Sequence, residues 1–92
     1  MRQIRQAVGD DFILIADGGI EDGFDAFKAL ALGADMVCVG RALMPPYASE
    51  GSEGVARMLT TITDELKSMM YRTSAATVRD IDPSLIHEAW WL

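Results

Sequence analysis

Residues 12–19 of this chain read Phe12-Ile13-Leu14-Ile15-Ala16-Asp17-Gly18-Gly19. The first five are apolar without a polar residue between them, which is typical of a strand covered on both faces, so we expect a buried strand over residues 12–16. Asp17-Gly18-Gly19 is a turn signal that ends the strand. The run therefore predicts a parallel sheet of an α/β protein.

A second apolar run covers residues 36–39 and ends in Gly40-Arg41. Ligands of parallel α/β folds bind at the carboxyl ends of strands, where glycine lets backbone N–H groups approach a phosphate closely. An adjacent arginine adds a guanidinium that matches phosphate oxygens. We therefore expect residues 17–19 and 40–41 to hold a phosphate-bearing ligand. The alternative is that the glycines only turn the chain and that Arg41 is a surface charge beside a carboxylate.

The segment between the two strands predicts a helix. Asp22 is its expected N-cap, Asp25 adds negative charge to the first turn, and Gly33 ends it. Its apolar residues recur at helical spacing: Phe24, Phe27, Leu30 and Ala31. The order strand, helix, strand indicates a parallel, right-handed βαβ unit. Residues 1–8 before this unit predict the end of another helix, with Gly9 at its C-terminus.

After the second strand, Pro45-Pro46 predicts a loop, because proline interrupts helices. Ser52 is the expected N-cap of a long helix, with Glu53 in its first turn. A stripe of apolar residues at spacings of three and four predicts the core face of this helix: Val55, Met58, Leu59, Ile62, Leu66, Met69 and Met70. We then expect a break over residues 73–77, one helical turn over residues 78–81 and a short helix over residues 85–90.

Composition excludes several classes of function. The chain has 92 residues and a net charge of −6, so it offers no basic patch for nucleic acid. No apolar run approaches the ~20 residues that span a bilayer, so we expect no membrane partner. The single cysteine, Cys38, excludes an internal disulfide and predicts a packed thiol and a cytoplasmic protein. The paired carboxylates lack the spacing of a calcium site and are read as solvated surface: Asp10-Asp11, Glu21-Asp22 and Asp64-Glu65. We therefore expect no metal.

Two parallel strands do not make a stable sheet, because both expose unpaired backbone groups and uncovered apolar faces. The chain therefore reads as part of a larger sheet or barrel. Either it is a fragment of a longer protein, or several copies assemble. We expect self-association through the exposed strand edges.

Several motifs resemble the C-terminal part of the FMN-dependent 2-hydroxy acid oxidase/dehydrogenase family, which includes glycolate oxidase and lactate oxidase. They are residues 15–20, 28–34, 39–41, 53–55 and 73–75. The resemblance implies that residues 12–16 and 36–39 are strands seven and eight of a TIM (β/α)₈ barrel. Residues 1–92 are then a partial barrel, with one βαβ unit, C-terminal helices and no second domain.

The same resemblance implies that FMN is the cofactor. Its binding residues would be Asp17, Gly18, Gly19, Gly40 and Arg41. Two positions depart from the family pattern: Glu21 stands where an arginine is usual, and Ala42 where a proline is common. Carboxylates at residues 21–22 beside a phosphate dianion would be repulsive, at a cost on the order of a few kcal/mol each if partly buried.

We expect no catalytic residue in this chain. The catalytic histidine, substrate-binding arginine and flavin-contacting lysine of the family belong to earlier strands, and His87 reads as a surface or packing residue. Trp90-Trp91 is either a partner anchor or packed under the barrel rim.

The resulting prediction is the FMN phosphate-binding portion of a flavin oxidoreductase acting on small 2-hydroxy acids, inactive as the isolated chain. The alternatives are a type 2 isopentenyl diphosphate isomerase, an IMP dehydrogenase, or a non-catalytic phosphate-binding or assembly module.

Overall fold

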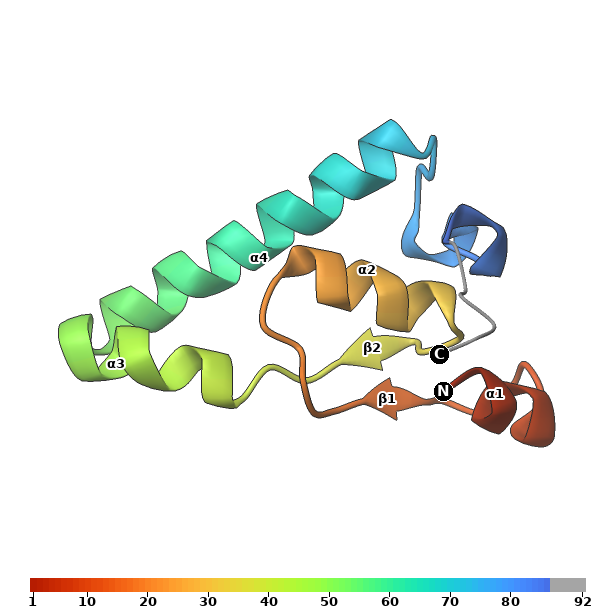
Figure 1. Cartoon of the computed structure of the whole chain (residues 1–92), viewed down its shortest axis with the longest axis horizontal. Helices are drawn as coiled ribbons and strands as arrows, with labels where there is room; N and C mark the ends of the chain where they lie inside the picture. Colours follow the sequence, from red (N-terminus) through yellow and green to blue (C-terminus); the bar gives the residue numbers. More distant parts are fainter. Residues whose placement is uncertain (87–92) are drawn as a thin grey trace, which may run out of the picture.

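A two-stranded parallel sheet, a helix laid on it and a long outer helix make up the fold (Figure 1). The computed structural model describes residues 1–86. The elements follow in the order α1 (Arg2–Val8), β1 (Ile15–Ala16), α2 (Gly23–Ala31), β2 (Met36–Val37), η1 (Arg41–Leu43), α3 (Met44–Glu50), α4 (Ser52–Arg72), η2 (Val78–Asp80) and η3 (Pro83–Leu85). None of the helices described is long and apolar enough to cross a membrane.

The predicted βαβ unit is confirmed, because β1 and β2 pair in parallel with Ile15 opposite Met36 and Ala16 opposite Val37. Both strands are shorter than the predicted residues 12–16 and 36–39. Ahead of β1, the Leu14 carbonyl accepts the backbone N–H of Asp35 at 2.8 Å, whereas the Leu14 N–H donates to the Asp35 carboxylate, also at 2.8 Å.

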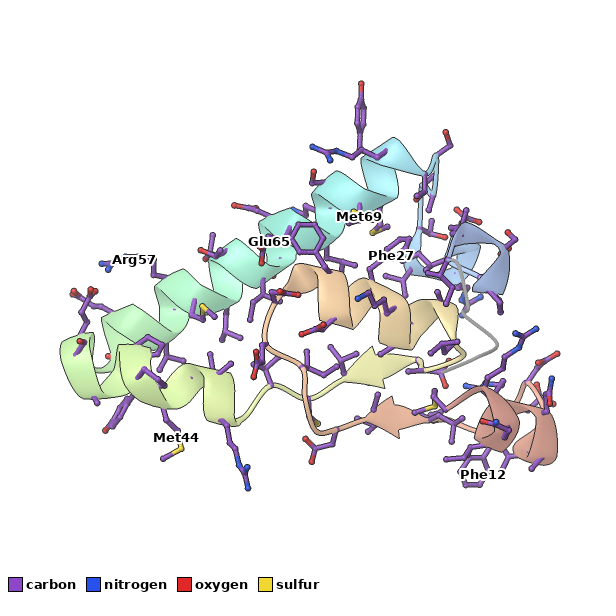
Figure 2. All side chains as sticks on the ribbon, in the orientation of Figure 1. Phe12, Phe27, Met44, Arg57, Glu65 and Met69 are labelled. Carbon is purple, nitrogen blue, oxygen red and sulfur yellow. The ribbon has the colours of Figure 1, made fainter. Side chains whose placement is uncertain are left out.

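The expectation that the first strand is covered on both faces is wrong for the described part of the chain. Leu14 is buried, but Phe12 and Ile13 are 59% and 70% exposed. Figure 2 shows the Phe12 ring at the outer margin of the molecule. Helix α2 covers one face of the sheet, and no described element covers the other (Figure 1).

Helix α2 begins as predicted, with Asp22 as N-cap accepting a hydrogen bond from the Asp25 N–H at 2.8 Å. Phe27, Leu30 and Ala31 are buried. They form the core with Ala75 and Ile81, and the partly buried Leu66, Met69 and Met70 of α4 pack against it. Two members of the predicted apolar faces are exposed instead: Phe24 at 41% and Leu59 at 43%.

Gly23 sets the distance between α2 and α4. A Cβ placed on it would lie 2.4 Å from the Glu65 Cβ and 2.5 Å from the Ile62 carbonyl oxygen. The Gly23 N–H, one of the N–H groups without a partner inside α2, donates to the Glu65 carboxylate at 3.0 Å. The start of α2 is therefore anchored directly on the middle of α4.

The segment after β2 differs from the prediction at two points. Pro45-Pro46 lies in the first turn of α3, where a missing N–H costs nothing, so the predicted loop is a helix. The N-cap of α4 is Gly51 at φ 64°, and Ser52 is the first helical residue without a capping hydrogen bond. Glu53 stands in the first turn as predicted.

The C-terminal turns partly follow the prediction. Residues 73–77 interrupt the helices, and η2 supplies the single turn expected over residues 78–81. Ile86 is extended at φ −123° and ψ 154°, so the helix expected over residues 85–90 does not run through this position. His87 and Trp90-Trp91 lie outside the described residues.

Arg5 ties α1 to the sheet. Its guanidinium donates to the carbonyl oxygens of Gly33 at 2.8 Å and Phe12 at 2.7 Å, and pairs with Asp35 at 2.7 Å. The Asp35 carboxylate also accepts the Leu14 N–H, which lowers its pKa below the ordinary value of 3.8, with the Arg5 hydrogen bond as the second cause.

We predict that Gly23→Ala lowers the free energy of unfolding by about 1–3 kcal/mol, because the new methyl group must push α2 away from α4. Urea denaturation measures the change. Gly40→Ala is the matched control, because a Cβ there meets nothing within 4 Å. Equal loss of stability in the two variants would contradict the proposed close approach.

We predict a pH dependence that comes from Asp35. Its pKa is lower in the folded chain, so its contribution to stability is present above pH ~4 and is lost as the pH falls through the folded pKa. Asp35→Asn should flatten the decline of unfolding free energy with acidification over that range. Asp64→Asn, on the exposed side of α4, should retain the wild-type slope.

Candidate functional site

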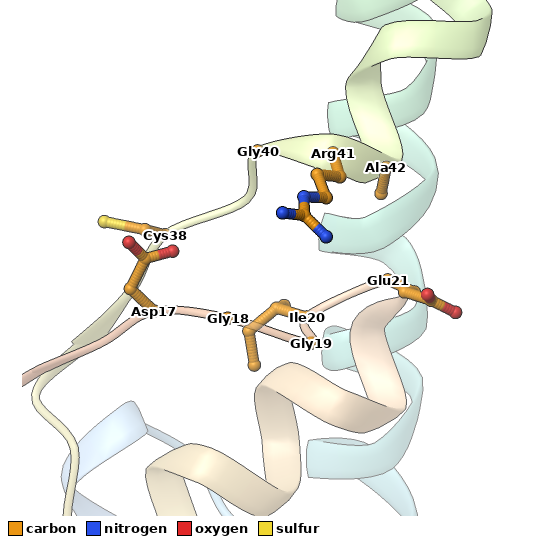
Figure 3. A pocket seen from close by; sticks show the side chains of 9 residues that line it. All are labelled: Asp17, Gly18, Gly19, Ile20, Glu21, Cys38, Gly40, Arg41 and Ala42. Atoms are coloured by element: carbon orange, nitrogen blue, oxygen red, sulfur yellow. The ribbon is translucent and has the colours of Figure 1, made fainter.

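A cavity of about 500 Å³ lies where the two strands end. Its lining is Asp17, Gly18, Gly19, Ile20, Glu21, Cys38, Gly40, Arg41 and Ala42 (Figure 3). All five residues predicted from the sequence to bind the phosphate-bearing ligand therefore meet at one place. The parallel pairing of β1 and β2 brings them together, because it puts both carboxyl ends at the same edge.

The three cavity glycines serve two different purposes. Gly18 and Gly19 have φ angles of 94° and 73°. Residues other than glycine rarely adopt these angles, so the turn itself requires glycine at both positions. Gly40 has φ −120°, and a Cβ on it would meet nothing within 4 Å. No packing contact within residues 1–86 requires glycine at position 40. Its lack of a side chain leaves the backbone open to the cavity.

Arg41 is the cation of the cavity. It begins the short helix η1, and Figure 3 shows its guanidinium extending into the space between the two loops. The side chain is exposed, and no salt bridge within residues 1–86 involves it. The alternative that pairs Arg41 with a carboxylate neighbour therefore has no partner in the described part of the chain, and its N–H donors face the cavity.

Cys38 also lines the cavity, and sequence reasoning missed it. The prediction of a packed thiol is wrong, because Cys38 is exposed and follows β2 instead of lying inside it. Its N–H donates to the Ala16 carbonyl at 2.8 Å, which holds the two loops in register. Successive side chains of a strand point to opposite faces of the sheet. This alternation along the second strand was the available signal for the exposure of Cys38.

The carboxylates of residues 21 and 22 differ in what they do. The Asp22 carboxylate caps α2, whereas Glu21 lines the cavity, and only its backbone N–H is bonded, to the Asp25 carboxylate at 3.1 Å. Figure 3 shows the Glu21 carboxylate directed away from the Arg41 guanidinium. Because the Glu21 side chain is exposed, water and salt screen its charge from an anion in the cavity.

This arrangement is suited to holding an anion. It combines backbone N–H groups of glycine loops with one guanidinium, the donor set of phosphate sites. The lining contains no histidine or lysine that could exchange a proton near neutral pH.

Residues 1–88 match the family described as FMN-dependent dehydrogenase. The chain is 41% identical over 88 residues to an L-lactate dehydrogenase of Acinetobacter baylyi, covering 96% of this chain and 23% of that protein. It is 47% identical over 78 residues to an L-lactate oxidase of Alicycliphilus denitrificans, covering 85% of this chain and 21% of that protein.

A solved structure has a similar fold. An oxidized active mutant of (S)-mandelate dehydrogenase superposes with a TM-score of 0.88 at 27% identity, over 96% of this chain and 24% of that one. The chain thus spans about a quarter or less of the length of the relatives that it matches. Its helix-rich α/β structure corresponds to a piece of their barrel.

We predict that Glu21→Gln changes the affinity of the chain for inorganic phosphate by less than about fivefold, because an exposed, screened carboxylate contributes little. Phosphorus NMR titration measures the affinity at physiological ionic strength. A larger gain would mean that the Glu21 charge reaches the anion, against the orientation in Figure 3.

Proposed function

The chain belongs to the FMN-dependent dehydrogenase family, and we propose that it forms the part of such an enzyme that holds the phosphate of FMN. The observation that carries the proposal is the Arg41 guanidinium, directed into a cavity between the Gly18-Gly19 turn and Gly40. FMN is the cofactor of the family, and its phosphate is a dianion that suits this donor set.

Different residues of the cavity would contact different parts of FMN. Backbone N–H groups at Gly19 and Gly40 can approach phosphate oxygens without interference from a Cβ, and Arg41 adds charge and paired donors. Asp17 carries an acceptor for hydroxyl groups of the ribityl chain. When bound, the flavin supplies the two-electron chemistry, and these residues hold and orient it.

For the whole enzyme we propose oxidation of small 2-hydroxy acids. The relatives are named for lactate and mandelate, which share a hydroxyl group beside a carboxylate. Such oxidation needs a base for the substrate proton, and no described residue of the cavity fills that role. We therefore propose that the chain is inactive in isolation and that residues beyond it complete the active site.

Family membership sets aside the isomerase and the IMP dehydrogenase as alternatives. A non-catalytic phosphate-binding module remains the second candidate, and ligand preference distinguishes it. A flavin site prefers FMN to both riboflavin and inorganic phosphate, whereas a bare phosphate module binds FMN and inorganic phosphate alike.

We predict that the isolated chain binds FMN more weakly than about 1 μM and binds riboflavin at least about tenfold more weakly still, because riboflavin lacks the phosphate. Flavin fluorescence measures both affinities. Arg41→Gln should weaken FMN binding by about tenfold or more. Arg57→Gln is the matched control, because Arg57 of α4 pairs with Glu50 of α3 and does not line the cavity. Equal affinity for FMN and riboflavin, or equal effects of the two variants, would overturn the proposal.

A further inference from the structure

Helix α4 contacts the element that follows each loop of the cavity, although none of its own residues lines the cavity. It packs against α2, which the chain enters after the Gly18-Gly19 turn, and against η1, which begins with Arg41. Figure 3 shows α4 passing behind both segments. The two sides of the cavity are therefore attached to the same helix.

The first attachment joins the turn side of the cavity to Glu65 of α4. The half-buried Glu65 carboxylate accepts the Gly23 N–H at 3.0 Å. A Cβ on Gly23 would lie 2.6 Å from the Leu66 backbone nitrogen, so the two helices are in direct backbone contact there. The Glu65 side chain thus holds the point at which the loop of residues 17–22 ends.

The second attachment lies about three turns earlier on α4. A Cβ on Gly54 would clash with the Pro46 carbonyl oxygen, so α3 lies directly on the first turn of α4. Helix α3 continues from η1 without an intervening residue, so this contact holds the segment that begins with Arg41. Three turns of a helix span about 16 Å, which fixes the separation of the two attachments.

We propose that Glu65 is a positioning residue for the cavity. By holding Gly23 on α4, it sets the distance between the Gly18-Gly19 turn and the Arg41 guanidinium. The inference rests on the proposed function, because it takes the phosphate of FMN as the anion in the cavity. Donors that already stand at the spacing of the phosphate oxygens bind more tightly, since ordering them during binding costs affinity.

The charge of Glu65 separates positioning from direct electrostatics. A carboxylate repels a phosphate dianion, so removing it would strengthen anion binding if its charge alone mattered. Positioning predicts the opposite sign for Glu65→Ala, because this variant loses the acceptor of the Gly23 N–H. Glu65→Gln keeps an acceptor oxygen without the charge. Glu65→Asp keeps the charge on a side chain that is one methylene shorter.

We predict that Glu65→Ala and Glu65→Asp weaken FMN binding by at least about fivefold, the effect of losing one hydrogen bond. Riboflavin binding should stay within about twofold, because riboflavin lacks the phosphate. Glu65→Gln should bind FMN within about twofold of the wild-type chain. Asp64→Ala is the matched control, since it removes the same charge from an exposed neighbour on α4. Flavin fluorescence measures the affinities, and circular dichroism verifies the fold of each variant.

Amide NMR of the ligand-free chain tests the placement of the turn without flavin. The Gly18 and Gly19 amide signals should shift in Glu65→Asp and keep their positions in Glu65→Gln and Asp64→Ala. Unchanged glycine signals in Glu65→Asp, or FMN binding by that variant as tight as by the wild-type chain, would overturn the positioning role. Equal wild-type affinity for FMN and riboflavin would instead overturn the proposed function, and the amide signals would still decide the role of Glu65.

Discussion

The contact between the start of α2 and the middle of α4 is the constraint on which the rest of the structure depends. Gly23 leaves no room for a Cβ, and its N–H is held by Glu65. Helix α2 is therefore fixed against α4 on one side and covers the sheet on the other (Figure 1). Both loops that leave and enter α2, and with them the positions of β1 and β2, follow from this placement.

The geometry of the cavity depends on that placement of α2. The turn at residues 17–19 needs glycine because of its left-handed backbone, and it delivers the chain to the Asp22 cap. Gly40 is different, because its φ is negative and no packing contact in the described part of the chain demands it. Gly40 lies next to the Arg41 guanidinium, which forms no salt bridge within residues 1–86, and this combination suits a closely approaching anion.

Local chemistry explains which predictions held. The N-cap at Asp22, the apolar spacing of Phe27 and Leu30 and the order strand, helix, strand can be recognised from local patterns in the sequence, and all are confirmed. The loop predicted at Pro45-Pro46 is wrong, because proline is excluded from helix interiors but not from the first turn of a helix. The prediction that residues 12–13 are buried is wrong, because no element in the described part of the chain covers that face of the sheet.

The sequence by itself determined the βαβ order, the two glycine-containing loops and the family to which they point, because these are carried by short motifs and by periodicity. Only the tertiary structure decided that Asp17, Gly19, Gly40 and Arg41 share one cavity, that the Glu21 carboxylate is directed away from the Arg41 guanidinium, and that Cys38 lines the cavity. The physical reason is that side-chain direction and the meeting of distant loops depend on how strands pair and helices pack, and those contacts join residues far apart in the chain.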